Sequence, residues 1–513
     1  MKILIALSIL IGLSPSIQGQ QNTDWFNLSF VEGGTAGAEV DDALKLIGNR
    51  PLDSIIVAVI DDGVDIFHED FKGKIWTNSD EIPDNGIDDD GNGYIDDVHG
   101  WNFLGNPRGE NIKNETLEIT RLFREYSKRF ENREISSISK KEEKDYEKYL
   151  QYKEEFEEEM SAIESQFSEY AQLASLYKGA QAFYFEAVRG DSFSAEKLAA
   201  WNPKTQDGEQ VKNFLLLAER EGLNAYLEGG EKYFENNLDY NLNTDFDPRP
   251  LVNESELPVG YGNKMVWAED PSHGTHVAGI IAAIRDNGKG VNGIAPNAII
   301  MPLRAVPGGD ERDKDIALAI RYAVDNGAKI INMSFGKAYS PEVELVFDAI
   351  KYAAKNDVLL IHAAGNDASN NDEIINYPDG TLGKGKGFKN FLTVAAGSSE
   401  PRASYLADFS NYGRKSVDIV APGVDINSLA PGNRTKYQSG TSMAAPVVSG
   451  VAALVWGLDS RLSAKKVKRI LVESANRLDE LMVGVGEQNL PLSDVLRNPA
   501  AISAKNAVEQ LID

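Results

Sequence analysis

Short apolar runs recur along the chain, and each is followed by glycine or by a segment with helical spacing. Five such runs lie at residues 54–60, 298–306, 328–335, 357–365 and 391–397. Runs of this length are typical of parallel strands buried on both faces, and intervening segments such as 313–327 have apolar residues at helical spacing. The pattern predicts an α/β fold, in which a mostly parallel sheet has helices on both faces.

Residues 106–260 have a different composition and are rich in Glu, Lys, Tyr and Phe. Apolar residues recur there at helical spacing in two series: Ile119, Leu122, Phe123, Tyr126 and Phe130, then Tyr146, Leu150, Phe156, Met160, Ile163, Phe167 and Tyr170. This spacing predicts amphipathic helices, in the simplest arrangement an antiparallel pair. We interpret the segment as a charged, solvated helical insertion packed on the α/β core, with a dedicated binding arm as the alternative.

The first residues have the pattern of a secretory signal peptide. Lys2 is followed by an apolar run too short to span a bilayer, then by small and polar residues up to Gly19, the expected cleavage point. No other stretch is apolar and long enough for a membrane helix. We therefore expect an exported protein, periplasmic or extracellular, with no transmembrane segment in the mature chain. The expected division is a signal peptide at 1–19, an N-terminal extension at 20–53, the α/β domain at 54–105 and 261–513, and the insertion at 106–260.

Composition narrows the classes of function. The chain has 513 residues, 42% of them hydrophobic, which is enough to bury a sizeable core. Its formal net charge of −27 argues against binding to nucleic acid, because phosphates would be repelled. The absence of cysteine excludes a thiol nucleophile, Cys-ligated zinc and disulfides. The oligomeric state stays open.

Three polar residues lie at strand ends and helix starts, where α/β proteins usually have their catalytic and ligand-binding residues. Asp61 follows the first apolar run, while His273 and Ser442 each precede a helix of small apolar residues. Taken singly, they are typical of a turn residue, a structural donor and a helix N-cap. Together they have the chemistry of a nucleophilic triad, because an imidazole can accept the serine proton while a carboxylate orients the imidazole.

Five stretches resemble the signatures of the subtilisin-like serine proteases, or subtilases: "VAVIDDGVD", "HGTHVAGI", "GTSMAAP", "AAGND" and "INMSFG". The resemblance covers residues 54–70 and 273–471 and leaves out the insertion. It implies a subtilisin-like fold and a secreted serine endopeptidase acting on proteins or peptides. The implied roles are a triad of Asp61, His273 and Ser442; an oxyanion hole of the Asn366 side chain and the Ser442 N–H; a substrate-binding strand of Ser334, Phe335 and Gly336; and a pocket wall of Ala363, Ala364 and Gly365.

Other assignments compete at some of these positions. Asp62 is the rival of Asp61, but it stands where the family often has a small polar residue, and we expect it to be exposed. A nucleophile elbow requires Gly-x-Ser-x-Gly and a different triad order, and here Ala444 occupies the fifth position. The remaining histidines are interpreted as structural: His68, His99, His276 and His362.

The stretch "DNGIDDDGNGYIDDVH" at 84–99 alternates oxygen-bearing residues with glycines. This pattern is typical of the first part of an EF-hand-like calcium loop, although the usual closing Glu is replaced by His99. The expected ligands are Asp88, Asp90, Asn92, the Tyr94 carbonyl and Asp96, with Asp97 as the alternative to Asp96. We favour a structural Ca²⁺ over an acidic solvated turn, because so many carboxylates repel one another without a cation. The family resemblance suggests a second calcium site near Asp70 and Asp286.

Two other functions stay open: a catalytically silent binding or scaffold protein on a subtilisin fold, and a calcium-dependent interaction protein acting through the insertion. The complete set of Asp61, His273, Asn366 and Ser442 counts against the first. Between Gly19 and the first strand there is room for about one helix, which is too little for the pro-domain that assists folding in many subtilases. We therefore expect activation without a large pro-domain, or with another element in its place.

Overall fold

The computed structural model describes residues 24–30, 34–190, 194–252, 261–381, 387–486 and 488–512, so the expected signal peptide lies outside it. The chain divides into an α/β unit, formed by Asn22–Glu118 with Asp247–Asp513, and a helical unit that contains Ile119–Phe246. The helical unit is shorter at both ends than the expected insertion at 106–260. The residues that flank it on either side belong to the α/β unit.

Within the described residues, the α/β unit is built on a nine-stranded sheet that is parallel except at one edge, where β10 pairs antiparallel with β13. The strand order is β10 (Asn476–Arg477), β13 (Ala500–Ala501), β7 (Ile419–Pro422), β6 (Phe391–Gly397), β5 (Leu359–Ala363), β4 (Ile330–Met333), β1 (Ile55–Asp61), β3 (Ala298–Arg304) and β2 (Trp101–Asn102). The five apolar runs form the adjacent central strands from β6 to β3. The predicted parallel sheet is confirmed.

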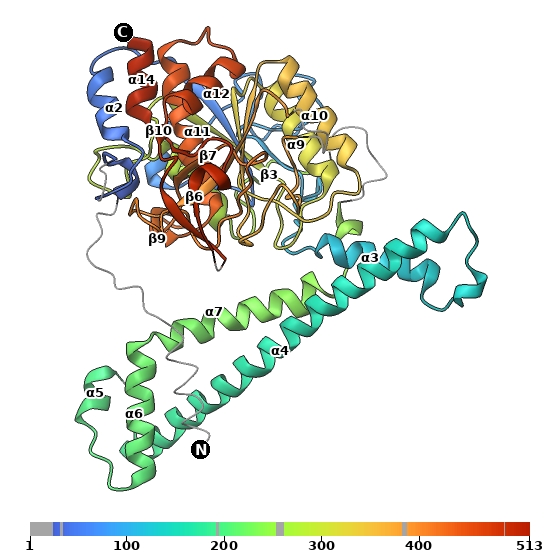
Figure 1. Ribbon diagram of the computed structural model, residues 1–513, viewed down its shortest axis with the longest axis vertical. Coiled ribbons are helices and arrows are strands. Elements are labelled where there is room, and N and C mark those ends of the chain that lie inside the picture. Colours follow the sequence, from blue (N-terminus) through green and yellow to red (C-terminus); the bar gives the residue numbers. More distant parts are fainter. Residues whose placement is uncertain are drawn as a thin grey trace. The chain divides into compact units, whose positions relative to one another are not determined.

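Both faces of the central strands are buried under helices (Figure 1). Successive side chains of a strand point to opposite faces, so Val57 and Val59 of β1 join one core, and Ala58 and Ile60 join the other. The first face carries α2 (Val40–Ile47), α8 (Ser272–Ala282), α11 (Thr441–Leu458), α12 (Ala464–Glu473) and α14 (Ala504–Ile512). The second face carries α9 (Asp313–Asp325) and α10 (Val343–Lys355).

Helix α11 is the central helix of the first face. It is apolar on nearly every side, because it packs against strands and against α8, α12 and α14. In the part of the chain that the structure describes, it is the one helix long and apolar enough to cross a membrane, and 89% of that stretch is buried inside the core. The helix expected after Ser442 is therefore present, and it begins at Thr441, so Ser442 lies within its first turn.

Smaller elements complete the α/β unit. Two antiparallel pairs are β8 (Ile426–Ala430) with β9 (Arg434–Gln438), and β11 (Met482–Val485) with β12 (Gln488–Pro491), which α13 (Leu492–Val495) follows. Single 3₁₀ turns lie at Trp25–Asn27, Glu69–Phe71 and Arg249–Leu251. The β8–β9 pair packs against α8 and so supports the helix that carries His273.

The helical unit consists of α3 (Glu118–Phe130), a 3₁₀ turn (Ile135–Ser137), α4 (Glu143–Val188), α5 (Ala195–Ala200), α6 (Gln206–Arg220), α7 (Leu223–Glu235) and a π-helical turn (Asn236–Asn241). Helices α3 and α4 run antiparallel: Phe123 stacks on Phe156 at 4.6 Å between ring centroids, and Phe130 lies 5.9 Å from Tyr149. The predicted antiparallel pair is therefore present, held by aromatic contacts.

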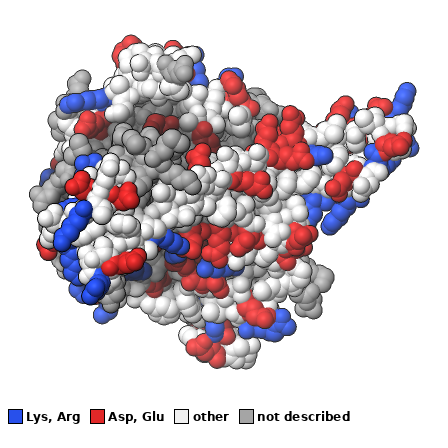
Figure 2. All heavy atoms as spheres, turned by 90° about the horizontal axis from the view of Figure 1, so that it is seen from below, with Lys and Arg blue, Asp and Glu red and all other residues white. Residues whose placement is uncertain are grey.

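A second apolar core joins the far half of α4 to α5, α6 and α7, with Tyr177, Tyr184 and Phe214 among its largest members. The helical spacing overestimates burial elsewhere, since Leu150 is 46% exposed and Phe167 is 41% exposed. Acidic side chains gather in patches on the face of the molecule seen in Figure 2, in keeping with the net charge of −27.

Candidate active site

The imidazole of His273 is held by a buried carboxylate. Its Nδ1 lies 2.7 Å from Oδ1 of Asp61, whose residue is 1% exposed. Since an ionised carboxylate can only accept, Nδ1 carries the proton of this hydrogen bond, and Nε2 of the neutral ring is left as an acceptor. A general base needs such an unprotonated nitrogen to accept the proton of a hydroxyl.

Two glycines permit this approach. Asp61 ends β1, and His273 lies in the first turn of α8 rather than just before the helix. A Cβ on Gly274 would lie 2.0 Å from the carbonyl oxygen of Gly63, and a Cβ on Gly63, where φ is +113°, would lie 2.5 Å from the Val266 carbonyl oxygen. Side chains at either position would force the helix start away from the strand end.

The structure corrects the expectation for Asp62. Its side chain is not exposed, because it accepts hydrogen bonds from the backbone N–H groups of His273 at 3.1 Å and Gly274 at 2.7 Å. The Asp62 carboxylate thus holds the start of α8, where unpaired N–H groups favour negative charge. Burial, and then the neighbouring charge of Asp61, raise the pKa of Asp62 to about 7.

These contacts also shift His273. Burial works against the imidazolium, but the charge of Asp61, its hydrogen bond and the charge of Asp62 outweigh burial and raise the pKa of His273 to about 9. The charge of Lys436 opposes them, and its ammonium donates to the hydroxyl of the preceding residue, Ser272, at 2.6 Å. The ring is therefore a stronger base than an ordinary histidine.

Ser442 lies in the first turn of α11 and faces the segment that follows β4. Its Oγ donates to the Ser334 carbonyl oxygen at 3.0 Å, and Oγ of Ser334 donates to the Ser442 carbonyl oxygen at 2.9 Å. Strands β1 and β4 are paired with Ile60 opposite Met333. The next residues, Asp61 at the end of β1 and Ser334 just after β4, therefore lie at the same edge of the sheet on adjacent strands. Among the described residues no hydrogen bond joins Ser442 to His273, so the structure forms the Asp–His pair and leaves the serine hydroxyl on Ser334.

The amide nitrogen of Asn366 and the backbone nitrogen of Ser442 both lie near Gly440. Oδ1 of Asn366 accepts from the Thr441 N–H at 2.9 Å and from the Thr441 hydroxyl at 3.0 Å, which fixes the amide. A Cβ on Gly440 would lie 3.6 Å from the Ser442 nitrogen and 3.7 Å from Asn366 Nδ2. As one of the first N–H groups of a helix, that of Ser442 has no intrahelical acceptor. Two donors therefore border the space that Gly440 leaves open.

The two segments expected to contact a substrate follow adjacent strands. Ser334 to Gly336 follows β4 and Ala363 to Gly365 ends and follows β5, and these strands are paired with Met333 opposite His362. Asn376 lies between them: its Nδ2 donates to the Ala364 carbonyl oxygen at 3.0 Å, and a Cβ on Gly336 would meet its Oδ1 at 2.4 Å. Sequence reasoning missed Asn376, since no motif surrounds it and only the folded loop carries it to this position.

Several of the expected calcium ligands in the acidic loop have hydrogen-bond or packing partners. Asp88 accepts from the backbone of Asn92 at 3.0 Å and Gly93 at 2.8 Å. Asp96 accepts from the Asn85 N–H at 3.1 Å and from the Lys264 ammonium at 3.2 Å. The Tyr94 ring packs edge-on against Tyr322 and Trp101. Two of the expected candidates join a compact group of carboxylates: Asp90, and Asp97, which was the alternative to Asp96.

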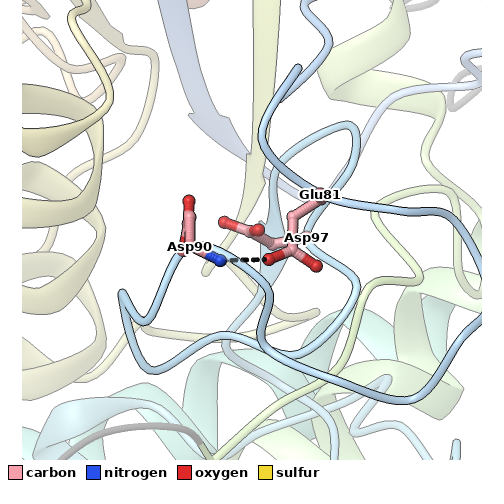
Figure 3. Close-up of side chains that lie close together, drawn as sticks. All are labelled: Glu81, Asp90 and Asp97. Carbon is pink, nitrogen blue, oxygen red and sulfur yellow. Dashed lines mark hydrogen bonds between the residues drawn. The ribbon is translucent and has the colours of Figure 1, made fainter.

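That group consists of Glu81, Asp90 and Asp97, each of which offers one oxygen, and the three oxygens lie within 4.8 Å of one another (Figure 3). Glu81 is 5% exposed and Asp97 is 0% exposed. Asn78 donates to both Asp90 and Asp97 at 3.0 Å. Burial raises the pKa of Asp97, although hydrogen bonds from Tyr322 and two asparagines act in the opposite direction. The ionised form of Asp97 is therefore disfavoured without a cation. Sequence reasoning missed Glu81 because it stands upstream of the repeating Asp pattern.

Asp70 also shows an unsatisfied carboxylate. Asn287 donates to its Oδ1, but its Oδ2 is buried and has no hydrogen-bond partner within the described part of the chain. Asp286, expected beside it, is exposed, and its backbone N–H donates to Asn292. An uncompensated buried oxygen is a feature that a cation would satisfy.

The other histidines have backbone partners, as expected for structural residues. Nε2 of His276 donates to the carbonyl oxygens of Ile426 at 3.1 Å and Lys436 at 3.0 Å, and burial lowers the pKa of His276 to about 3. Nε2 of His362 donates to the Phe335 carbonyl oxygen at 2.8 Å, and burial lowers the pKa of His362 to about 4. His68 and His99 also bond to backbone carbonyl oxygens, of Arg434 and Trp76.

Comparisons with known proteins identify relatives. A model of the subtilase family matches residues 53–489. The cell wall-associated protease of Bacillus subtilis (strain 168) is 40% identical over 45% of this chain and 24% of its own length. The thermophilic serine proteinase of Bacillus sp. (strain AK1) is 39% identical over 45% of this chain and 51% of its own length. The chain thus matches about a quarter and about half of these two proteins. A solved protease from Pseudoalteromonas arctica matches 47% of this chain and 72% of its own with 28% identity and a TM-score of 0.38.

The charges around His273 predict its titration. We expect a pKa of about 9, compared with 6.5 for an ordinary histidine. Asp62→Asn should lower this pKa, because a negative charge that favours the imidazolium is lost, and Asp61→Asn should lower it further. NMR titration of the imidazole signals measures both, with His276 as an internal control that stays neutral above pH 5.

The same shift predicts a change of stability with pH. Because the folded pKa exceeds the unfolded one, the stabilisation from His273 is complete below pH 6.5 and is lost as the pH rises toward 9. Chemical denaturation across this range should show a smaller loss in Asp61→Asn than in the parent protein. If the pKa of His273 is the same in the parent protein, in Asp61→Asn and in Asp62→Asn, the two carboxylates are not the cause of the raised pKa.

Proposed function

The chain belongs to the subtilase family, and we propose that it is a serine endopeptidase that hydrolyses peptide bonds in proteins. The proposed catalytic residues are Asp61, His273 and Ser442. One observation carries the proposal: a buried carboxylate holds Nδ1 of His273 at 2.7 Å, at the edge of the sheet where Ser442 contacts the adjacent strand end.

In the proposed reaction, a backbone N–H of the substrate donates to the Ser334 carbonyl oxygen and displaces the Ser442 hydroxyl, which turns to Nε2 of His273. His273 accepts the hydroxyl proton as Oγ bonds to the carbonyl carbon, and Asp61 stabilises the imidazolium. His273 then gives that proton to the leaving amine as the C–N bond breaks. Water repeats the sequence on the acyl-enzyme and releases the carboxylic acid and the free serine.

The oxygen of the attacked carbonyl becomes an oxyanion in the first step. We propose that the Asn366 amide and the Ser442 N–H donate to it, because both border the space beside Gly440. The α11 dipole adds to this stabilisation, since its positive end lies at Ser442. Such donors lower the barrier because they are already oriented before charge develops.

We propose that the substrate binds as an added strand along Ser334, Phe335 and Gly336. The side chain before the scissile bond would then enter between this segment and the wall formed by Ala363, Ala364 and Gly365. Asn376 lies between the two segments and would present a polar group to that side chain. This position makes Asn376 our candidate for the residue that selects the substrate side chain.

We propose that the protein is exported, to the periplasm or outside the cell. The pattern of residues 1–19 supports export, and the lack of cysteine is compatible with any redox compartment. One relative carries the name of a cell wall-associated protease.

We propose that calcium binds between Glu81, Asp90 and Asp97. Calcium takes oxygen ligands at about 2.3–2.6 Å, so oxygens on opposite sides of the ion lie up to about 5 Å apart, and the three carboxylates meet this spacing. Bound calcium would neutralise buried negative charge and tie the acidic loop to helix α9 through Asp97, whose Oδ2 accepts from the Tyr322 hydroxyl. Asp70 is a second candidate ligand because of its unpartnered buried oxygen.

Ser442→Ala should abolish hydrolysis of casein and leave the fold unchanged, because the hydroxyl is the proposed nucleophile. A serine-directed phosphonate should label the parent protein at Ser442, as measured by peptide mass analysis. Ser449→Ala is the matched control, since this buried hydroxyl of the same helix contacts Asn332 and not the site. Absence of both label and hydrolysis in folded parent protein would instead favour a catalytically silent binding protein.

Asn366→Ala should lower kcat by about 100- to 1,000-fold with little change in KM, since an oxyanion donor acts in the transition state. The Ser442 label should still form. Steady-state kinetics on a peptide amide give the comparison, with Asn370→Ala as a control on the same loop, because the Asn370 amide donates to Glu373. A mainly raised KM would contradict the role assigned to Asn366.

Removal of calcium by a chelator should lower the melting temperature. A ligand present at about 100 times its Kd stabilises the native state by about 2.7 kcal/mol, which shifts the transition of a protein of this size by about 2–4 °C. Asp97→Asn and Glu81→Gln should abolish this dependence on calcium, whereas Asp96→Asn should retain it, because Asp96 faces Lys264. Calorimetry with and without chelator provides the measurement, and identical curves for the parent protein would count against the site.

A further inference from the structure

Lys337 directly follows the segment Ser334–Gly336 and is buried, with 5% of the residue exposed. Its ammonium lies 2.9 Å from Oε2 of Glu118, 2.9 Å from Oδ1 of Asp313 and 2.8 Å from the carbonyl oxygen of Glu311. The three N–H bonds of the ammonium therefore all have acceptors. A buried lysine so completely paired fixes the position of its own backbone.

The backbone of Lys337 is fixed as well. Its N–H donates to the Tyr377 carbonyl oxygen at 3.1 Å, and the Tyr377 N–H donates back at 2.9 Å. Tyr377 is the neighbour of Asn376, which touches Gly336 and Ala364. Lys337 thus stands at the corner where the two segments proposed to bind substrate are joined.

The partners of Lys337 mark the place where the chain leaves the α/β unit. Glu118 is the last residue of that unit before the helical unit begins, and its N–H donates to Asp310 at 2.7 Å. On the return, Arg249 forms a bidentate pair with Asp315 at 2.8 and 3.2 Å. Asp313 and Asp315 both lie in the first turn of α9. The first turn of α9 therefore anchors three parts of the chain. Asp313 binds Lys337, which holds Glu118 before the helical unit and borders the proposed substrate-binding segment, and Asp315 binds Arg249 after the helical unit.

We propose that Lys337 is a positioning residue that, through its pairs with Glu118 and Asp313, holds the segment Ser334–Gly336 in the shape needed for strand-like substrate binding. The proposal rests on the proposed peptidase function. Burial works against the lysine charge, but Glu118, Glu311 and Asp313 outweigh burial and raise the pKa of Lys337, so the ammonium stays charged. Removal of one partner leaves the segment less fixed without touching the triad.

The test compares two variants with two matched controls. Glu118→Gln weakens the acceptor at Lys337, and Glu115→Gln makes the same change three positions away, where Glu115 pairs with Arg312 at 3.0 Å. Lys337→Met removes the ammonium, and Lys468→Met removes another largely buried one, which pairs with Asp418 at 3.0 Å. The substrates are a peptide amide series with one to four residues before the scissile bond.

In Glu118→Gln and Lys337→Met we expect kcat/KM for the four-residue substrate to fall by about tenfold or more, mostly through KM. The one-residue substrate and the rate of phosphonate labelling at Ser442 should change less than about twofold, because neither uses the segment as a strand. The controls should show no dependence on substrate length. A merely structural role would lower stability without this dependence.

Equal effects on long and short substrates, or the same length dependence in the controls, would overturn the proposal. If Lys337→Met does not fold, the comparison of Glu118→Gln with Glu115→Gln decides alone, since Glu118→Gln keeps the ammonium paired with Asp313. Failure of the phosphonate to label folded parent protein would refute the peptidase function itself. A labelled parent with length-independent variants would refute only the role of Lys337.

Discussion

The hydrogen bond between His273 and Asp61 joins residues 212 positions apart, and the arrangement of the site depends on it. It forms because a parallel sheet ends its strands at one edge, and because glycines let α8 begin directly above the end of β1. The buried carboxylate has few competing partners, so its charge acts mainly on the imidazole. Every later step, from the basicity of His273 to the direction in which Nε2 faces, follows from this contact.

The sequence predicts well what depends on local pattern. The apolar runs around Ile56, Ile300 and Leu360 became adjacent parallel strands, because nothing else buries unbroken stretches of this kind on two faces. The apolar helix after Ser442 had to lie in a core for the same reason. The Asp61–His273 contact was foreseen from residue types and chain order, although the serine hydroxyl faces Ser334 in this structure.

What the sequence misses depends on tertiary approach. Asp62 was expected in solvent, but the helix start lies so close that its N–H groups need an acceptor, and Asp62 supplies it. In the acidic loop, alternation of carboxylates suggested Asp88 and Asp96 as ligands, which stays a prediction; the fold adds that Asp88 accepts from the loop backbone and Asp96 from Lys264. Glu81 and Asn376 carry no local signal, because folding alone brings them to their neighbours.

The position of the helical unit in the chain has a physical rationale. An inserted segment costs little loop-closure entropy if its ends start close together, since that cost grows only slowly with length. Here both ends are fixed at the first turn of α9: Glu118 pairs with Lys337, which pairs with Asp313, and Arg249 pairs with Asp315. Breaking a buried pair by removing one partner costs about 3–5 kcal/mol, so these anchors are strong constraints. An α/β unit that already orders this turn can therefore accept a long insertion, and the same anchors keep the segment after β4 in place.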